Sequence, residues 1–344
     1  MTTTHVLMTA MPPTVGHAAL IRFAHSLGWP VNVIVHAQPG EPMVTARMAS
    51  VCRHVDKNYP DSGVKMMGLH TDRDDDPEGN GFQEYWNNLM RYRIGVQPGD
   101  IICSSEPYGK WLAEATGATF IPFDRDRIFQ KVKATNIRDE VPWDLSDIMP
   151  EFRQYLRAEV VVFGAESCGK TTAVEAITGI WDKTDEWARP YLEMVGPEIT
   201  REKMLTIVDG QGALEHTSRE MSTAAAIVRD TDLYSTLGFW QSPGYEFLGD
   251  PPSSLFLNAR KADLYIIMPS DRIDFHADQI RYGGDKRETN DQYWIDLCKK
   301  NHLPYVVMPS DLKTVRQAGW WIETKVNEVI ATKHQQIAYD RKGR

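Results

Sequence analysis

Residues Gly164–Thr171 read G-A-E-S-C-G-K-T and fit the phosphate-binding pattern G-x-x-x-x-G-K-[ST]. The pattern directly follows the apolar run E-V-V-V-F, so a strand is expected to lead into a glycine-rich turn and then a helix. Such a turn points successive backbone N–H groups, and the positive end of the helix, at an anion. We therefore expect a nucleoside triphosphate here, with Lys170 on its β- and γ-phosphates and the Thr171 hydroxyl on Mg²⁺. The other loop residues expected at the nucleotide are Gly164, Glu166, Ser167, Cys168, Gly169 and Thr172.

Such a phosphate loop also needs a carboxylate at the end of a neighbouring strand to complete the magnesium shell. The sequence I-V-R-D-T-D supplies Asp230 and Asp232 after the apolar run 224–228. We expect Asp230 to hold Mg²⁺ with Thr171 and Asp232 to bind the phosphoryl acceptor; a plain surface turn is the alternative. Glu186 is a third candidate near the acceptor. The sequence does not rank these three carboxylates as the base that takes the acceptor's proton.

Basic residues surround the flexible pair Gly283-Gly284. Arg281 precedes the pair, and Lys286 and Arg287 follow it. This arrangement is typical of a mobile lid that brings positive charge to a transferring phosphoryl group, with a solvated basic loop as the alternative. Together these motifs predict an NTP-dependent phosphotransferase or NTPase and leave its acceptor open.

The first half of the chain carries a second set of candidate phosphate ligands. Thr14-Val15-Gly16-His17 fits the short pattern [HT]-x-G-H of nucleotidyltransferases that use a Rossmann-like sheet. The Thr14 hydroxyl and the His17 imidazole would bind ATP phosphates at a helix N-terminus and favour the charge that develops on a pentavalent α-phosphorus. A structural histidine after glycine is the alternative interpretation.

Residues Val132–Arg138, V-K-A-T-N-I-R, resemble the signature [IV]-S-x-T-x-[IVL]-R at the other end of the same type of active site. The resemblance implies that Thr135 and Arg138 grip the β- and γ-phosphates and that Gly16 lies against the nucleotide. Lys133 stands where the signature usually has serine, so a cation replaces one hydroxyl contact.

Five segments resemble a single family in the same order. They are T-x-G-H, S-S-E-P at 104–107, F-D-R-D-R at 123–127, A-T-N-I-R and G-A-E-S-C-G-K-T. From about residue 5 to about residue 330, the chain resembles the bifunctional nicotinamide-mononucleotide adenylyltransferases and ribosylnicotinamide kinases of the NadR type. The segment E-W-A-R-P-Y-L-E at 186–193, the D-T-D turn and the basic residues around Arg281 belong to the same resemblance.

The resemblance implies ATP as co-substrate, Mg²⁺ as cofactor, and nicotinamide mononucleotide (NMN), ribosylnicotinamide and NAD as ligands. The second half would phosphorylate ribosylnicotinamide to NMN, and the first half would adenylylate NMN to NAD with release of pyrophosphate. Arg47 is a further candidate phosphate contact. The flat cationic ring of NMN would prefer an aromatic face, for which Tyr85 or Trp86 is the candidate, with core packing as the competing interpretation.

Two other functions fit the same motifs. One keeps the P-loop kinase but makes its acceptor another nucleoside, with the first half a nucleotidyltransferase for pantetheine phosphate or a lipid precursor. The other makes the first half a catalytically weak, NAD-sensing domain, because Lys133 replaces serine and Thr14 replaces histidine.

Two parallel sheets are needed to position these motifs. In the first half, strands are expected at 5–10, 31–37, 100–103 and 118–123, with a helix at 18–27. The second half has apolar runs at 159–163, 224–228, 262–268 and 303–308 and a helical pattern at 314–331. A turn-rich segment at 141–150 separates the two series. The predicted fold class is α/β, with a Rossmann-like nucleotidyltransferase domain at 1–150 and a P-loop kinase domain at 151–344.

Composition narrows the class of protein further. The 344 residues carry a net charge of -9, which disfavours non-specific binding to nucleic acid. No apolar run approaches the ~20 residues of a membrane span, and the first residues lack a secretory leader, so we expect a cytoplasmic protein without a membrane partner. The four cysteines form no C-x-x-C pair, which predicts reduced thiols. A homo-oligomer is compatible with the sequence and is not specified by it.

Overall fold

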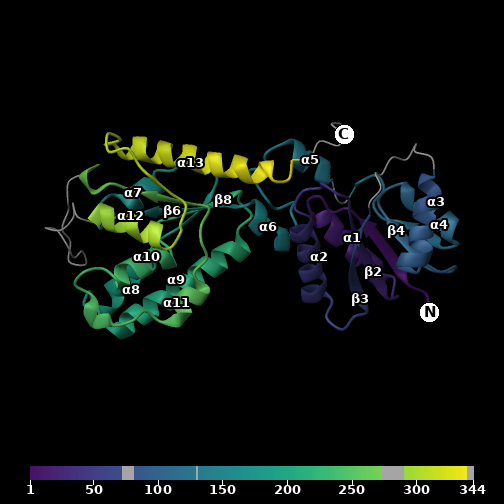
Figure 1. The fold of residues 1–344 in the computed structure, drawn as a ribbon, viewed down its shortest axis with the longest axis horizontal. Coiled ribbons are helices and arrows are strands. Elements are labelled where there is room, and N and C mark those ends of the chain that lie inside the picture. The colour runs from purple at the N-terminus through teal and green to yellow at the C-terminus, as the bar shows by residue number, and fades with distance from the viewer. Residues whose placement is uncertain (72–80, 129–130, 273–289, 339–344) are drawn as a thin grey trace. The chain divides into compact units, whose positions relative to one another are not determined.

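The computed structural model describes residues 1–71, 81–128, 131–272 and 290–338. The chain forms two compact units (Figure 1), Met1–Tyr155 joined by the described residues from His334 on, and Leu156–Lys333. The break between them falls within helix α6, Pro150–Leu156. Each unit has its own five-stranded parallel sheet, so the predicted fold class of two parallel-sheet α/β domains is confirmed.

The sheet of the first unit has the strand order β3-β2-β1-β4-β5. Its strands are β1 (Thr4–Met8), β2 (Val31–Ala37), β3 (Val64–His70), β4 (Ile101–Ser104) and β5 (Thr119–Pro122). In this order β1 lies between β2 and β4, with Val6 opposite both Val33 and Cys103. The chain therefore changes direction across the sheet at β1, which is where parallel sheets of this kind bind ligands beyond their carboxyl ends.

Helices cover both faces of the first sheet. They are α1 (Val15–Ser26), α2 (Val44–Asn58), α3 (Phe82–Asn88), the π-helix η1 (Leu89–Ile94), α4 (Tyr108–Thr116) and α5 (Ala134–Asp139). Successive strand residues face opposite sides, so Val6 packs with Ile21 of α1 and Val51 of α2, while Leu7 packs with Trp86 of α3 and Leu112 of α4. Burial on both faces explains why most residues of β1 and β2 are apolar.

The sheet of the second unit has the order β10-β9-β6-β8-β7. Its strands are β6 (Ala158–Phe163), β7 (Asp182–Thr184), β8 (Ala226–Arg229), β9 (Leu264–Ile267) and β10 (Tyr305–Val307). The central strand β6 pairs with β8 and β9, and its apolar run is buried from Val160 to Phe163. The loop that follows β6 thus starts at the middle of the sheet.

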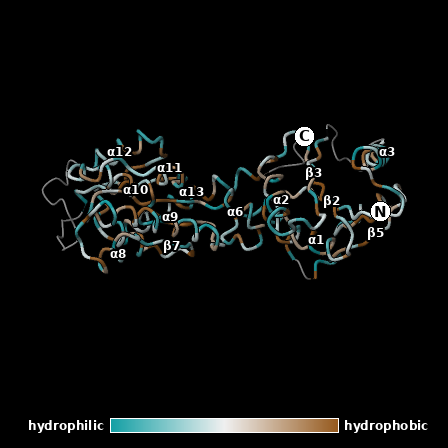
Figure 2. The backbone as a smooth tube through the Cα atoms, turned by 90° about the horizontal axis from the view of Figure 1, so that it is seen from below, coloured by the Kyte–Doolittle hydropathy of each residue, from teal (hydrophilic) through white to brown (hydrophobic). Residues whose placement is uncertain are grey.

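The helices of the second unit pack on both sides of this sheet. They are α7 (Lys170–Glu175), α8 (Ala188–Val195), α9 (Arg201–Met221), α10 (Leu233–Trp240), α11 (Ser253–Asn258), α12 (Asn290–Lys300) and α13 (Val315–Gln335), with short 3-10 helices η2 (Glu246–Leu248) and η3 (Ser270–Arg272). Along the backbone, apolar and polar residues interleave (Figure 2), as elements with one buried face require. Within the described residues, no helix is long and apolar enough to cross a membrane.

Candidate active sites

The phosphate loop of the second unit curls tightly between β6 and α7. Gly164, Ser167 and Gly169 have positive φ angles of 143°, 59° and 86°. A Cβ atom on Gly164 would lie 2.7 Å from the Met268 carbonyl oxygen and 2.9 Å from the Cys168 Sγ, so only glycine fits there. Helix α7 begins at Lys170, as the motif predicts.

Lys170 is held inside this loop as a cation. Its Nζ donates hydrogen bonds to the carbonyl oxygens of Gly164 at 3.1 Å and Ala165 at 2.8 Å. Burial works to lower the pKa of Lys170, but the surrounding negative groups, including Asp230 and Glu186, raise it above its ordinary value. The ammonium group therefore remains charged at neutral pH and can neutralise phosphate oxygens.

Thr171 and Asp230 meet across the end of the sheet. The Thr171 hydroxyl donates to Asp230 Oδ2 at 2.5 Å, and Asp230 is 1% exposed. Among the described residues, Asp230 Oδ1 has no hydrogen-bond partner although it is buried. Burial raises the pKa of Asp230, and the neighbouring Lys170 opposes that rise. A hydroxyl beside a carboxylate with an unused buried oxygen fits Mg²⁺, which takes oxygen ligands and keeps several waters.

A cavity of about 140 Å³ opens beside the phosphate loop. Its polar lining residues include Lys170, Thr171, Glu186, Gln211 and Thr236. Its apolar and aromatic lining residues are Leu192, Ile199, Met204, Ile207, Phe239 and Tyr245. The cavity can therefore contact both polar and apolar parts of a ligand. Glu166, Ser167, Gly169 and Thr172 also line it, whereas Gly164 and Cys168 lie outside its lining.

Asp232 lies behind this cavity and does not line it, contrary to its predicted role at the acceptor. It is the N-cap of α10, where Oδ1 accepts the Ser235 N–H at 2.8 Å, and its Oδ2 accepts the Tyr265 hydroxyl at 3.0 Å. Burial, followed by the nearby Glu215 carboxylate, raises the pKa of Asp232 to about 7. The Asp232 side chain thus caps α10, whereas the sequence predicts that it contacts the substrate.

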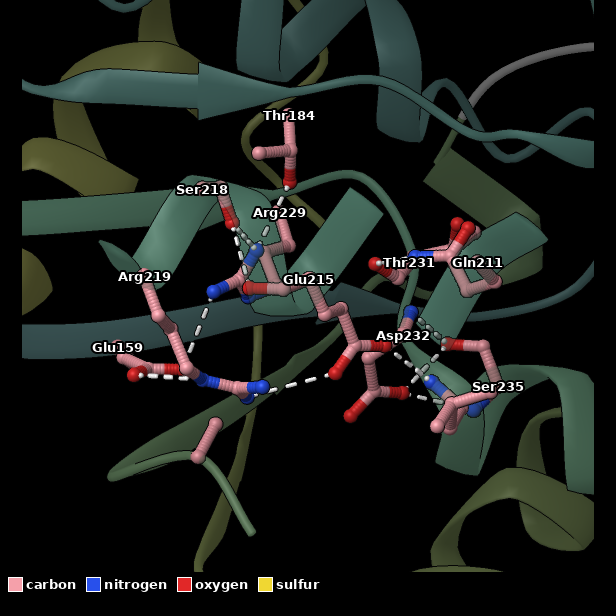
Figure 3. A network of polar contacts seen from close by, with 12 residues as sticks. Glu159, Thr184, Gln211, Glu215, Ser218, Arg219, Arg229, Thr231, Asp232 and Ser235 are labelled. Carbon is pink, nitrogen blue, oxygen red and sulfur yellow. Dashed lines mark hydrogen bonds and ion pairs between the residues drawn. The ribbon is translucent and has the colours of Figure 1, made fainter. Parts of the chain in front are cut away.

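Asp232 belongs to a network of polar contacts that joins α9 to the start of α10 (Figure 3). Glu215 of α9 accepts the Leu233 N–H at 2.7 Å and pairs with Arg219 at 3.3 Å, and Arg219 also pairs with Glu159 at 2.9 Å. Gln211, one helical turn before Glu215, donates to the Thr231 carbonyl at 3.2 Å. Gln211 and Thr231 both line the cavity, so the network fixes part of its wall. No local motif marks Gln211, which is why sequence reasoning missed it.

In the first unit, the T-x-G-H segment forms the start of α1. The Thr14 backbone N–H donates to His17 Nδ1 at 3.0 Å, and the Thr14 hydroxyl lies 2.8 Å from the same nitrogen. Burial first, and then the cations Arg127 and Arg47, lower the pKa of His17 to about 4. The ring is therefore neutral at pH 7, and because Nδ1 accepts a backbone N–H, its proton is on Nε2, which can donate to a phosphate.

A cavity of about 620 Å³ lies at the carboxyl ends of the strands of the first sheet. One group of lining residues can bind phosphates: Thr14, Gly16, His17, Arg127, Lys133, Thr135 and Arg138. A second group is aromatic: His36, Phe82, Trp86, Tyr108 and Trp111. The structure thus brings T-x-G-H, S-S-E-P and A-T-N-I-R to one cavity, although they are far apart in sequence. Arg138 donates to the Met11 carbonyl and, at 3.3 Å, to the Thr135 hydroxyl.

Of the two predicted stacking residues, only Trp86 lines this cavity. Its ring is 5% exposed and contacts the His36 ring at 5.1 Å between centroids. Tyr85 instead packs at the edge of Trp86 against the core cluster on that face of the sheet. The π-helical segment that follows α3 continues this core.

Arg47 is a structural residue and does not line the cavity. It is 1% exposed and donates to the carbonyl oxygens of Thr9 at 2.8 Å and His36 at 3.2 Å. It also pairs with the buried Glu41 at 2.9 Å. These hydrogen bonds link Arg47 to the ends of β1 and β2, and its predicted phosphate contact stays a prediction.

Arg127 of the F-D-R-D-R motif lines the cavity, and the sequence alone predicts no role for it. It pairs with Glu106 at 2.6 Å and donates to the Val132 carbonyl at 3.0 Å. Asp124 and Arg127 both adopt left-handed backbone conformations, with φ of 42° and 52°. The strained turn presents Arg127 to the cavity between two motifs. The predicted lid residues Arg281 and Arg287 lie outside the described residues.

The fold and the two sites define a class: a Rossmann-like α/β domain followed by a P-loop nucleotide-binding domain. Residues 159–314 match a family described as AAA domain. The chain is 23% identical over 242 residues to the trifunctional NAD biosynthesis/regulator protein NadR of Salmonella typhimurium (strain LT2), and the Escherichia coli (strain K12) protein of that name gives the same values. The match covers 67% of this chain and 58% of those relatives, so only part of their length is represented.

Solved structures of NadR share the fold. The NadR protein in complex with NAD and AMP-PNP superposes with a TM-score of 0.62, 18% identity, and coverage of 96% of both chains. The NadR protein in complex with NR gives a TM-score of 0.59, 19% identity, and coverage of 98% of this chain and 97% of that one. The chain is therefore similar to NadR proteins in sequence and has their two-domain architecture.

Proposed function

We propose that this protein is a bifunctional enzyme of NAD biosynthesis, which phosphorylates ribosylnicotinamide to NMN and adenylylates NMN to NAD. One observation carries the proposal: each parallel sheet ends in its own cavity, one with Lys170 and the Thr171–Asp230 pair, the other with a neutral His17 beside Arg138. The similarity to NadR, with structures in complex with NAD, AMP-PNP and NR, supports these two reactions.

In the second unit, the 5′-hydroxyl of ribosylnicotinamide attacks the γ-phosphorus of ATP and ADP leaves. Thr171 and Asp230 would hold Mg²⁺, which neutralises charge on the phosphates when bound. Asp230 is bonded to Thr171 and Asp232 caps α10, so Glu186, the one of the three candidate carboxylates that lines the cavity, would accept the hydroxyl proton. The apolar side chains that line the cavity would pack against the pyridine ring and exclude water.

In the first unit, the 5′-phosphate of NMN attacks the α-phosphorus of ATP and pyrophosphate leaves. The Nε2–H of His17, the Thr135 hydroxyl and the guanidinium of Arg138 bind the triphosphate, and no covalent enzyme intermediate forms. Lys133 lines the same cavity and supplies a cation where the related signature has a hydroxyl. Trp86 offers the pyridine ring an aromatic wall.

The test uses the whole chain with ATP, Mg²⁺ and ribosylnicotinamide, and follows NMN, NAD and pyrophosphate by chromatography. We expect NMN to appear first and NAD to follow. Lys170→Ala should still form NAD from NMN and fail with the riboside, whereas His17→Ala should convert the riboside to NMN and stop there. Loss of both reactions in either variant would contradict two independent sites, and tight NAD binding without pyrophosphate release would support a sensing role for the first unit.

A further inference from the structure

Arg272 is a buried cation next to the phosphate loop that the reaction scheme does not use. It ends the 3-10 helix η3, just after β9, and is 3% exposed. One terminal nitrogen donates to the Cys168 carbonyl at 3.2 Å and the other donates to the Leu312 carbonyl at 3.0 Å. Over the part of the chain that the structure describes, no carboxylate forms an ion pair with it. Burying a cation is costly, and the hydrogen bonds to these two carbonyls offset part of that cost.

The Cys168 carbonyl belongs to the loop that cradles the phosphates. Ser167, Gly169 and Lys170 line the cavity, whereas Cys168 is fully buried and does not. In a planar trans peptide the carbonyl and the following N–H point in opposite directions. Because Arg272 holds the Cys168 oxygen on the buried side of the loop, the Gly169 N–H is directed to the opposite side, where the cavity lies.

The backbone at this point needs an external restraint. Ser167, which precedes the restrained peptide, is a non-glycine residue with φ of 59°. Such a left-handed conformation costs of order 1 kcal/mol and persists only where the surroundings hold it. The hydrogen bond that Arg272 donates to the Cys168 carbonyl supplies that restraint.

The segment that presents Arg272 is itself fixed at several points. The backbone N–H and the hydroxyl of Ser270 donate to Asp291 of α12 at 2.9 and 3.1 Å. Lys313 donates to the Asp271 carbonyl at 2.9 Å. These hydrogen bonds hold the segment that carries Arg272, which is 104 residues from Cys168 in sequence.

We propose that Arg272 is a positioning residue for triphosphate binding: by holding the Cys168 carbonyl, it keeps the Gly169 N–H pointed at the phosphates. The proposal rests on the proposed function only in that this cavity binds a triphosphate. It does not depend on which hydroxyl receives the phosphoryl group.

The experiment compares Arg272→Met, Arg272→Lys and a matched control, Arg157→Met, in the full chain. Arg157 is another buried arginine of this unit, and it donates to the carbonyl oxygens of Ser222 and Arg219. Mg²⁺·ATP and inorganic tripolyphosphate are titrated calorimetrically, and the P-loop component is defined as the binding that Lys170→Ala loses. Kinase assays then give the KM for ATP and for the riboside separately, and scanning calorimetry shows whether the second unit, which contains both arginines, is folded in each variant.

We expect Arg272→Met to weaken ATP and tripolyphosphate alike by about tenfold, equal to ~1.4 kcal/mol, in the range of one charge-assisted hydrogen bond. Arg272→Lys should recover part of this loss because one donor remains. Arg157→Met should leave P-loop affinity unchanged. In the kinase assay, the KM for ATP should rise while the KM for the riboside stays constant.

Three results would overturn the proposal: unchanged P-loop affinity in Arg272→Met, an equal loss in Arg157→Met, or weaker ATP binding with normal tripolyphosphate binding. The last would mean that Arg272 contacts the base or ribose directly. If the wild-type chain binds ATP at the P-loop but does not phosphorylate the riboside, the proposed function fails while the binding comparison still tests Arg272.

Discussion

Replacing Gly210 with alanine tests the packing that shapes the kinase cavity. Gly210 lies inside the helix α9, and a Cβ atom there would come within 1.8 Å of Trp187 Nε1. Trp187 stacks on Tyr191 at 6.3 Å, and its backbone N–H donates to Gln211. The added methyl must therefore displace an indole ring whose chain neighbour Glu186 lines the cavity.

The magnitude follows from two opposing effects. Overpacking at this distance should cost ~3 kcal/mol, the upper part of the usual range, whereas glycine to alanine inside a helix gains ~1 kcal/mol. The net loss of about 2 kcal/mol should lower the melting temperature of a domain this size by roughly 4–8 °C. Scanning calorimetry of the full chain measures the change, and the transition of the second unit is the one whose response to AMP-PNP is lost in Lys170→Ala.

Gly212 provides a matched control on the same helix. A Cβ atom on Gly212 would have its nearest contact at 3.6 Å, to Leu233 Cδ1, which is ordinary packing. Gly212→Ala should therefore raise the melting temperature through the helix-propensity gain alone. We also expect Gly210→Ala to raise the KM for ribosylnicotinamide and to leave NAD formation from NMN unchanged. If Gly210→Ala is as stable as Gly212→Ala, the packing of Trp187 described above is wrong.

Three further perturbations test the catalytic assignments. Asp230→Asn should lower riboside kinase turnover by about 100-fold or more, because one buried magnesium ligand is lost, with adenylyl transfer intact; a Mg²⁺ titration of both activities checks this. Glu186→Gln should reduce kcat by about 100-fold and leave the KM for ATP unchanged, if it is the base; unchanged kcat would exclude that role. The pKa of His17 is about 4 in the folded protein and 6.5 in the unfolded chain. The free energy of unfolding of the first unit should therefore fall by about 3 kcal/mol as pH falls from 6.5 towards 4. Urea unfolding, measured across this pH range, should show that the unfolding free energy depends less on pH in His17→Gln than in the wild type. An unchanged pH dependence would contradict the neutral ring.

Two kinds of element follow directly from the local sequence. The mostly apolar segments that form β1, β2 and β6 are buried on both faces of their sheets. Their composition alone therefore predicts buried strands. The turn at Gly164 needs glycine because of its own φ and the adjacent Met268 carbonyl, which is why the phosphate loop can be recognised from eight contiguous residues.

Other elements depend on distant partners and were not predicted. Strand β7 is only D-K-T, and it exists because Asp182–Thr184 pairs with β8 at an edge of the sheet. Strand β3, V-K-M-M-G-L-H, has an irregular burial pattern and is defined by its pairing with β2. Short or mixed segments of this kind carry too little hydrophobic pattern to be recognised alone.

By itself, the sequence determined the two-domain α/β class and the motifs that can bind phosphates, because backbone turns and buried strands are encoded by neighbouring residues. The tertiary structure alone decided which charged and aromatic side chains reach each cavity: Glu186 but not Asp232, and Trp86 but not Tyr85. It likewise made Arg47 a buried link between strands. The physical reason is that a polar side chain bonds to whatever acceptors folding brings within about 3 Å, and those acceptors come from remote parts of the chain.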